Sequence, residues 1–261
     1  MKLKYVAGVV GMLMLAGVAH ADSFVNGGFE NGDTSGWTTG GGYRGLIGNS
    51  DLTPAQFLPG GTLNSDDGSR GAVIDGSYVD PHLGSLLGST IYSGKYAYRA
   101  EDTSTGGYAT AISQKVNNYT DSQIVFAWKA VLENGGHEEN DSAVMKLTLV
   151  DDTTGQLLVS RTYNAGYTGS GVDSRFLNDA STGLFYTPTW QVETLSIDSS
   201  LAGHNFTLSL LAADCSPTAH TGYAYLDGFG AALPVPEPTT YGMMLAGLGM
   251  LGMVARRKKS A

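Results

Sequence analysis

One segment of the chain begins like a zinc-binding motif. Residues 137–141 read HEEND, which starts as the H-E-x-x-H signature but has Asp141 where the second histidine belongs. That signature holds a metal only when both ligands share one face of a helix, and the glycines and asparagines around this segment favour a loop. We therefore interpret residues 137–141 as an acidic loop exposed to solvent.

The single cysteine, Cys215, lies five residues before His220. A cysteine beside a histidine could act as a nucleophile with its base. That chemistry needs a third group to orient the base, and the neighbouring residues do not identify one. One cysteine also excludes an internal disulfide and a zinc site built on paired cysteines. We expect structural roles for Cys215 and His220, and we predict no catalytic residues.

Acidic and aromatic residues could act on sugars, but the sequence does not identify which of them would do so. A pair of carboxylates could hydrolyse a glycosidic bond, and exposed aromatic rings could stack on sugar rings. The acidic runs at 66–67 and 151–152 lack the spacing of an EF-hand loop. Trp128 and Phe206 are expected in the core. The other candidate rings lie among glycines and serines: Trp37, Tyr43, Tyr78, Tyr92, Tyr108, Tyr167 and Tyr186.

The composition limits the class of protein. The chain has 261 residues, 37 of them Gly, with 15% charged residues and a formal net charge of −9. The glycines show no period of three, which excludes collagen. Hydrophobic residues make up 42% of the chain, which is enough for a core and excludes a wholly disordered protein. Because phosphate binding needs a basic surface, we expect no nucleic-acid partner.

The first 21 residues have the pattern of a secretory signal peptide. Lys2 and Lys4 precede an apolar run at 5–18, and Ala19 and Ala21 supply the small residues that signal peptidase reads. We expect a signal-peptide helix that is cleaved before Asp22. The alternative is a membrane anchor, but the run is short of the roughly 20 residues that a spanning helix needs.

The last residues, 234–261, combine a rigid motif, an apolar stretch and a basic end. The stretch at about 239–255 can just span a bilayer as a helix, and the basic end would hold the C-terminus in the cytoplasm. The alternative is an ordinary tail anchor. The motif is Pro236, Glu237 and Pro238, and the basic end is Arg256, Arg257, Lys258 and Lys259.

This tail resembles the PEP-CTERM sorting signal of Gram-negative bacteria, a family that commonly occurs in bacteria that make exopolysaccharide. The resemblance implies recognition by an exosortase, a transient intermediate anchored in the inner membrane, cleavage near Pro236-Glu237-Pro238, and delivery to the cell surface or matrix. Without both ends, residues 22–235 keep 9 basic and 23 acidic residues, a formal net charge of −14. Divalent cations suit such a surface.

Residues 22–233 are expected to form one all-β domain, a β-sandwich or jelly roll. Short β-rich runs alternate with clusters of Gly, Asn, Asp and Ser, and no window outside the two ends has helical periodicity. The run at 124–131 is apolar on both faces, which predicts a central strand. The expected strands are 95–99, 109–116, 124–132, 144–150, 157–163, 191–197, 205–212 and 223–229, with a hairpin turn at 151–155.

The two edges of this domain carry a second resemblance. Residues 26–37 (NGGFENGDTSGW) and 223–227 (YAYLD) are similar to the opening and closing segments of galactose-binding-like jelly rolls, which occur among carbohydrate-binding modules. In many relatives the opening Glu and the closing Asp ligate a structural Ca²⁺. The resemblance implies that Glu30 and Asp227 are metal ligands here.

The leading hypothesis is a non-catalytic, exported surface or matrix protein whose domain binds polysaccharide. Its alternatives are a secreted hydrolase that acts on exopolysaccharide and a purely structural matrix protein. The sequence does not select a set of ligand-binding residues. A cleft with two facing carboxylates would favour the hydrolase.

We predict that the mature protein lacks residues 239–261, because the apolar segment and basic end form a transient stop in the membrane. Intact mass of the exported protein tests this, and a wild-type species that retains Arg256–Lys259 would contradict it. Replacement of Pro236, Glu237 and Pro238 by Ala should leave the protein in the inner membrane.

Overall fold

The computed structural model describes residues 23–65, 69–217 and 219–230. The signal peptide with Ala19, Ala21 and Asp22, and the sorting tail with Pro236–Pro238 and Arg256–Lys259, lie outside these residues. Within them, no helix is long and apolar enough to cross a membrane.

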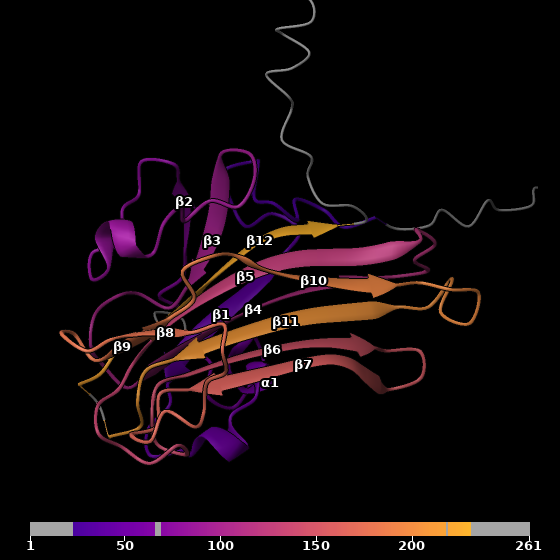
Figure 1. Cartoon of the computed structure of the whole chain (residues 1–261). Helices are drawn as coiled ribbons and strands as arrows, with labels where there is room; N and C mark the ends of the chain where they lie inside the picture. Colours follow the sequence, from indigo (N-terminus) through magenta and orange to yellow (C-terminus); the bar gives the residue numbers. More distant parts are fainter. Residues whose placement is uncertain (1–22, 66–68, 218, 231–261) are drawn as a thin grey trace, which may run out of the picture.

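Two antiparallel sheets face each other, which confirms the predicted all-β sandwich (Figure 1). The five-stranded sheet has the order β1-β4-β11-β6-β7, and its strands are Thr38–Tyr43, Tyr108–Val116, Phe206–Ala213, Val144–Asp151 and Gln156–Asn164. The seven-stranded sheet has the order β2-β3-β12-β5-β9-β8, and these strands are Ala72–Asp75, Tyr96–Ala100, Gly222–Gly230, Gln123–Glu133, Leu184–Tyr186 and Leu177–Asp179. Strand β10, Gln191–Ser196, also pairs with β5.

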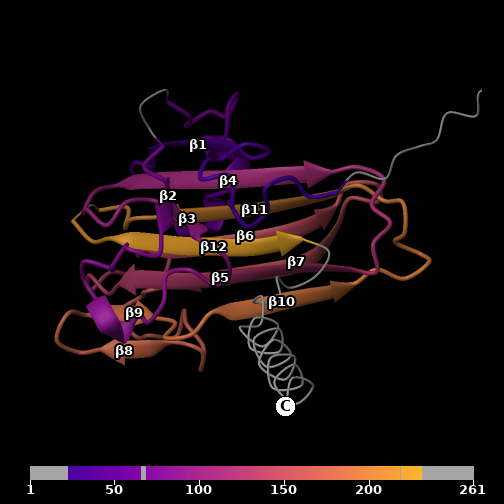
Figure 2. The ribbon, with the colours of Figure 1, turned by 90° about the horizontal axis from the view of Figure 1, so that it is seen from above.

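The long strand β5 is the centre of the seven-stranded sheet. One of its edges pairs with β12, and its other edge pairs with β10 over Gln123–Trp128 and with β9 over Val131–Glu133 (Figure 2). As predicted, both faces of β5 are buried. Alternate residues from Ile124 to Leu132 join the core between the sheets.

A second layer covers the outer face of each sheet. Segment 76–91, which includes the 3₁₀ turn η2 (Gly84–Leu86), covers the seven-stranded sheet, where Lys129 of β5 donates to the Ser89 carbonyl at 3.0 Å. Segment 44–65 covers part of the five-stranded sheet. It contains η1 (Asn49–Asp51) and the short helix α1 (Pro54–Phe57), and Leu52 and Phe57 pack on alanines of β4.

All eight expected strands are present, and so is the hairpin turn between β6 and β7, where Gly155 has φ +76°. Strands β1, β2, β8 and β9 were not predicted. Strand β1 was not predicted because its sequence is TTGGGY, and glycine is depleted in strands. A Cβ at Gly40 would lie 2.2 Å from the Phe57 carbonyl oxygen, so that glycine allows segment 57–64 to pass over the strand.

Candidate functional site

A buried arginine organises one end of the sandwich. The Arg44 side chain is completely buried, and burial lowers its pKa to about 10. Its guanidinium donates to the carbonyls of Asp214 at 2.5 Å and Ile47 at 2.6 Å and to Asn49 Oδ1 at 2.8 Å. A buried cation is tolerated only when such acceptors replace water. Arg44 therefore joins the turn after β1 to the loop that links β11 and β12.

The same turn docks on the loop between β5 and β6. Asn49 Nδ2 donates to the carbonyls of Glu139 at 2.6 Å and Ser142 at 3.0 Å, and the Ser50 amide donates to Asn140 Oδ1 at 2.8 Å. Glycine at residue 48 leaves room for the Asn140 side chain, because a Cβ there would lie 2.0 Å from Asn140 Nδ2. These bonds fix two loops that are about 90 residues apart in sequence.

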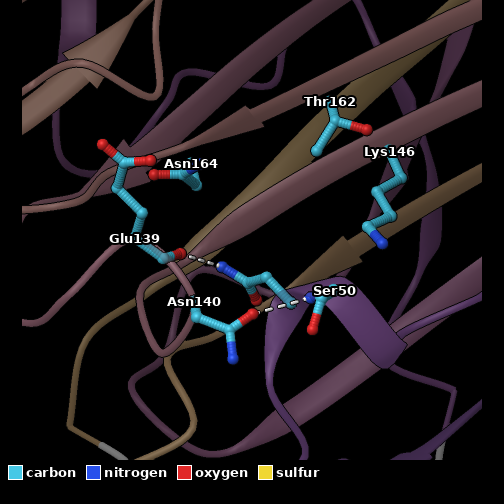
Figure 3. A pocket seen from close by; sticks show the side chains of 7 residues that line it. Ser50, Glu139, Asn140, Lys146, Thr162 and Asn164 are labelled. Atoms are coloured by element: carbon cyan, nitrogen blue, oxygen red, sulfur yellow. Dashed lines mark hydrogen bonds between the residues drawn. The ribbon is translucent and has the colours of Figure 1, made fainter.

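A polar groove of about 270 Å³ opens where this turn, this loop and strands β6 and β7 meet (Figure 3). Lys146 borders it and donates from Nζ to the Leu52 carbonyl at 2.7 Å. The groove presents amides, hydroxyls, one ammonium and one carboxylate, so it offers both donors and acceptors. Its lining residues are Asn49, Ser50, Glu139, Asn140, Lys146, Thr162 and Asn164.

A row of hydroxyl groups lies beside the groove on the outer face of the five-stranded sheet. Lys146 pairs with Thr162. The next pair along the same two strands whose side chains point to the outer face is Thr148 with Ser160. The register continues this row across the other three strands. Its members, from β1 to β7, are Thr38, Ser113, Ser209, Thr148 and Ser160. Neighbouring members are about 4.8 Å apart because that is the spacing of paired strands.

The seven candidate aromatic residues do not gather at one site. Trp37 and Tyr186 are buried, so neither can stack on a sugar. Tyr43 and Tyr167 are exposed. A second cavity, of about 470 Å³, is formed by segment 76–91 and includes Tyr78, and no carboxylate is among its described lining residues.

Glu30 and Asp227 both bind the backbone just before β3. Glu30 accepts hydrogen bonds from the amides of Lys95 at 3.0 Å and Tyr96 at 3.2 Å. Asp227 Oδ2 accepts from the amides of Tyr92 at 2.9 Å and Ser93 at 3.1 Å. The two ends of the domain therefore meet at segment 92–96. Metal ligation by this pair stays a prediction.

The carboxylate of Glu30 beside Asp227 gives these surroundings one feature of a cation site. Burial raises the pKa of the Asp227 carboxyl to about 7, although hydrogen bonds from backbone amides lower it, and the negative charge of Glu30 makes a smaller contribution to the rise. A bound Ca²⁺ would relieve that repulsion, and carboxylate oxygens are its preferred ligands. Glu30 is exposed, so an ion could reach the pair from solvent.

The described residues contain one buried pair of acids elsewhere, Glu101 and Asp214. Burial raises the pKa of Glu101 to about 7 despite hydrogen bonds from Thr110 and the Asp102 amide. Burial, and then the Glu101 charge, raises the pKa of Asp214 to about 8. Both side chains are completely inaccessible, so a substrate cannot reach them as it would reach the acids of a glycosidase.

Residues 137–141 form a loop, as predicted, and not a helix. The structure also brings His137 of this segment to Cys215 and His220, from the loop between β11 and β12. The sequence offered no sign of that meeting, because the two segments are about 80 residues apart.

Comparison with known proteins gives one informative match. The family model for the PEP-CTERM protein-sorting motif matches residues 234–259. The chain carries a PEP-CTERM sorting motif. This motif implies export to the cell surface, as expected from the tail. A search of curated proteins finds no match.

Solved structures with a similar outline share little sequence with this chain. The carbohydrate-binding module TmCBM61, solved with β-1,4-galactotriose, is 13% identical, with 80% of this chain and 97% of that chain covered and a TM-score of 0.40. A module specific for non-crystalline cellulose, CBM28, is 10% identical, with coverages of 80% and 94% and a TM-score of 0.38. The K1 cleaved adhesin domain of Lys-gingipain from Porphyromonas gingivalis W83 is 13% identical, with coverages of 78% and 94% and a TM-score of 0.37.

We predict that Arg44→Lys destabilises the domain by about 2 kcal/mol, because an ammonium cannot reach all the acceptors that the guanidinium serves. Urea denaturation measures the loss. The matched control is Arg161→Lys. Arg161 forms a partly buried ion pair with Glu193 near the surface, and its replacement should cost less than about 1 kcal/mol. Equal effects at the two positions would contradict a special role for Arg44.

The raised pKa of Glu101 predicts a pH dependence. The folded state favours the protonated carboxyl, so stability present below about pH 4.5 is lost as the pH rises through about 7. Glu101→Gln should therefore flatten the fall in unfolding free energy between pH 5 and 8, by up to about 1.4 kcal/mol per pH unit. Urea denaturation across this range tests it, with the exposed Glu138→Gln as control. Parallel profiles for wild type and Glu101→Gln would contradict the shift.

Proposed function

We propose that the chain is an exported cell-surface or matrix protein whose domain binds polysaccharide without catalysis at the groove of Figure 3. Signal peptidase would remove residues 1–21, and an exosortase would then process a transient inner-membrane intermediate held by the tail. The groove is the observation that carries the binding proposal. It joins oriented amides, hydroxyls and a lysine on rigid strands and tied loops.

The chemistry of the groove supports a sugar ligand. Sugar hydroxyls donate and accept hydrogen bonds, and the amide of Asn164, the hydroxyl of Thr162 and the ammonium of Lys146 match both roles. The volume is a little below the roughly 300–1,000 Å³ of typical ligand pockets, which suits one unit of a longer chain. Thr148 and Ser160, accessible members of the adjoining hydroxyl row, would continue the contact along a polymer.

The groove does not favour hydrolysis. Glycosidases need two carboxyl groups about 5–9.5 Å apart, and Glu139 is the only carboxylate among the described lining residues. A bound polysaccharide would therefore be held and not cleaved.

We predict that Thr162→Trp weakens binding to exopolysaccharide from the producing bacterium by more than about tenfold, which is 1.4 kcal/mol. Thr162 is exposed at the groove, so an indole there blocks access without disturbing the core. The control is Thr194→Trp, an exposed position on the outer face of the other sheet. Calorimetric titration measures both. Unchanged affinity in Thr162→Trp, or loss in the control alone, would move binding away from the groove.

We also propose that Glu30 and Asp227 hold a structural Ca²⁺ between the opening loop and the closing strand. Their convergence on segment 92–96 and the repulsion between the two carboxylates support this site. An ion that binds only the folded state stabilises it by about 2.7 kcal/mol at a hundredfold excess over Kd.

Calcium should accordingly raise the melting temperature of the domain above its value in chelator. Glu30→Gln should remove most of that difference, because it removes one charged ligand. Glu138→Gln, an exposed acid on another loop, should leave the difference intact. Identical melting curves with calcium and with chelator in the wild type would exclude the site.

A further inference from the structure

Three side chains of types that can bind a metal, His137, Cys215 and His220, meet at the end of the sandwich that carries the groove, although they do not line it. Two of them come from the connection between β11 and β12. The Cys215 amide donates to the His220 carbonyl at 3.3 Å, and Ala219 has a φ of +77°, so the chain reverses sharply within this loop. The reversal brings Cys215 Sγ and His220 Nδ1 to 3.3 Å.

The third side chain, His137, comes from the loop between β5 and β6. Its Nε2 atom lies 3.1 Å from His220 Nδ1. The Tyr167 amide donates to the His137 carbonyl at 2.9 Å, which fixes this part of the loop. A Cβ at Gly135 would lie 2.1 Å from His220 Nδ1, so glycine at that position makes room for the imidazole.

The spacing of the three ligand atoms suits one metal ion. All of them lie within 4.8 Å of one another. In tetrahedral zinc sites, Zn–N bonds near 2.05 Å and Zn–S bonds near 2.3 Å separate the ligand atoms by about 3.3–3.6 Å. Two of the three separations, 3.1 and 3.3 Å, are close to that range, and the third is at most 4.8 Å.

We propose that His137, Cys215 and His220 form a site for Zn²⁺, with water or an outside ligand in the fourth position. One thiolate and two imidazoles favour zinc over calcium, which takes oxygen ligands. The Cys215 thiol would lose its proton to solvent when the metal binds. Cys215 is buried and both histidines are half-buried, so the ion would enter from the histidine side.

Such an ion would add metal bonds between two loops that a hydrogen bond and a histidine ring contact already join. The His137 loop continues into Glu139 and Asn140 of the groove. The Ser216 amide donates to the Asp141 carbonyl at 2.7 Å, so the two loops are already held side by side. The metal site is separate from the Glu30–Asp227 pair and needs no polysaccharide.

The test uses the full chain in detergent micelles, reduced and without a polyhistidine tag. Competition with a chromophoric chelator should give one Zn²⁺ per chain, and excess Ca²⁺ should not displace it. Co²⁺ should give a thiolate-to-metal charge-transfer band, which Cys215→Ser abolishes. His220→Ala and His137→Gln should each weaken Zn²⁺ binding more than about a hundredfold, since loss of an outer-shell partner alone costs about 10- to 100-fold.

The matched control is His82→Ala, an exposed histidine away from the cluster, which should bind Zn²⁺ as the wild type does. Circular dichroism shows whether each variant is folded. If His220→Ala does not fold, the Zn²⁺ affinity of His137→Gln, a variant in a surface loop, tests the site. Absence of stoichiometric Zn²⁺ binding by the wild type would overturn the proposal. An unchanged Co²⁺ spectrum in Cys215→Ser would also overturn it.

Discussion

The burial of Arg44 is the interaction on which the geometry of the candidate groove depends. A guanidinium without water must have its hydrogen bonds supplied by the protein, and those bonds reach the turn at 47–49 and the carbonyl of Asp214. The turn then binds the loop between β5 and β6 through Asn49. One cation thus fixes three segments that are remote in sequence.

The second organising feature is the covering of both outer faces. The inner faces of the two sheets form the core, but β5 and β12 are buried on their outer sides as well. Segment 76–91 covers one sheet and segment 44–65 part of the other. The part of the five-stranded sheet outside this cover carries the hydroxyl row beside the groove, so the proposed binding surface can extend beyond the groove.

Alternation along the chain predicted much of the fold. Ile124, Phe126 and Trp128 share a face because strand side chains alternate, and all three lie in the core. The same alternation holds in strand β12, where Leu226 lies in the core and Asp227 binds the Tyr92 amide on the other side of the strand. Strand β1 was missed because glycines carry no side-chain pattern, although glycine is what the crossing of segment 57–64 requires.

The groove and the histidine–cysteine cluster could not be predicted from the sequence. Asn49, Asn140 and Thr162 meet only after three separate segments have docked. The spacing of residues within each segment does not predict that docking. His137 comes from one loop and Cys215 with His220 from another, and neither loop alone has the ligand spacing of a metal site. The sorting tail was predictable since its three parts are contiguous.

The central claim is that the groove fixed by Arg44 is where a polysaccharide binds. Amide chemical-shift perturbation of the exported domain, titrated with exopolysaccharide from the producing bacterium, tests it most directly. The largest shifts should fall at residues 49–50, 139–140, 146 and 162–164, and should extend along the hydroxyl row. Shifts confined to segment 76–91, or none at saturating polysaccharide, would contradict the claim.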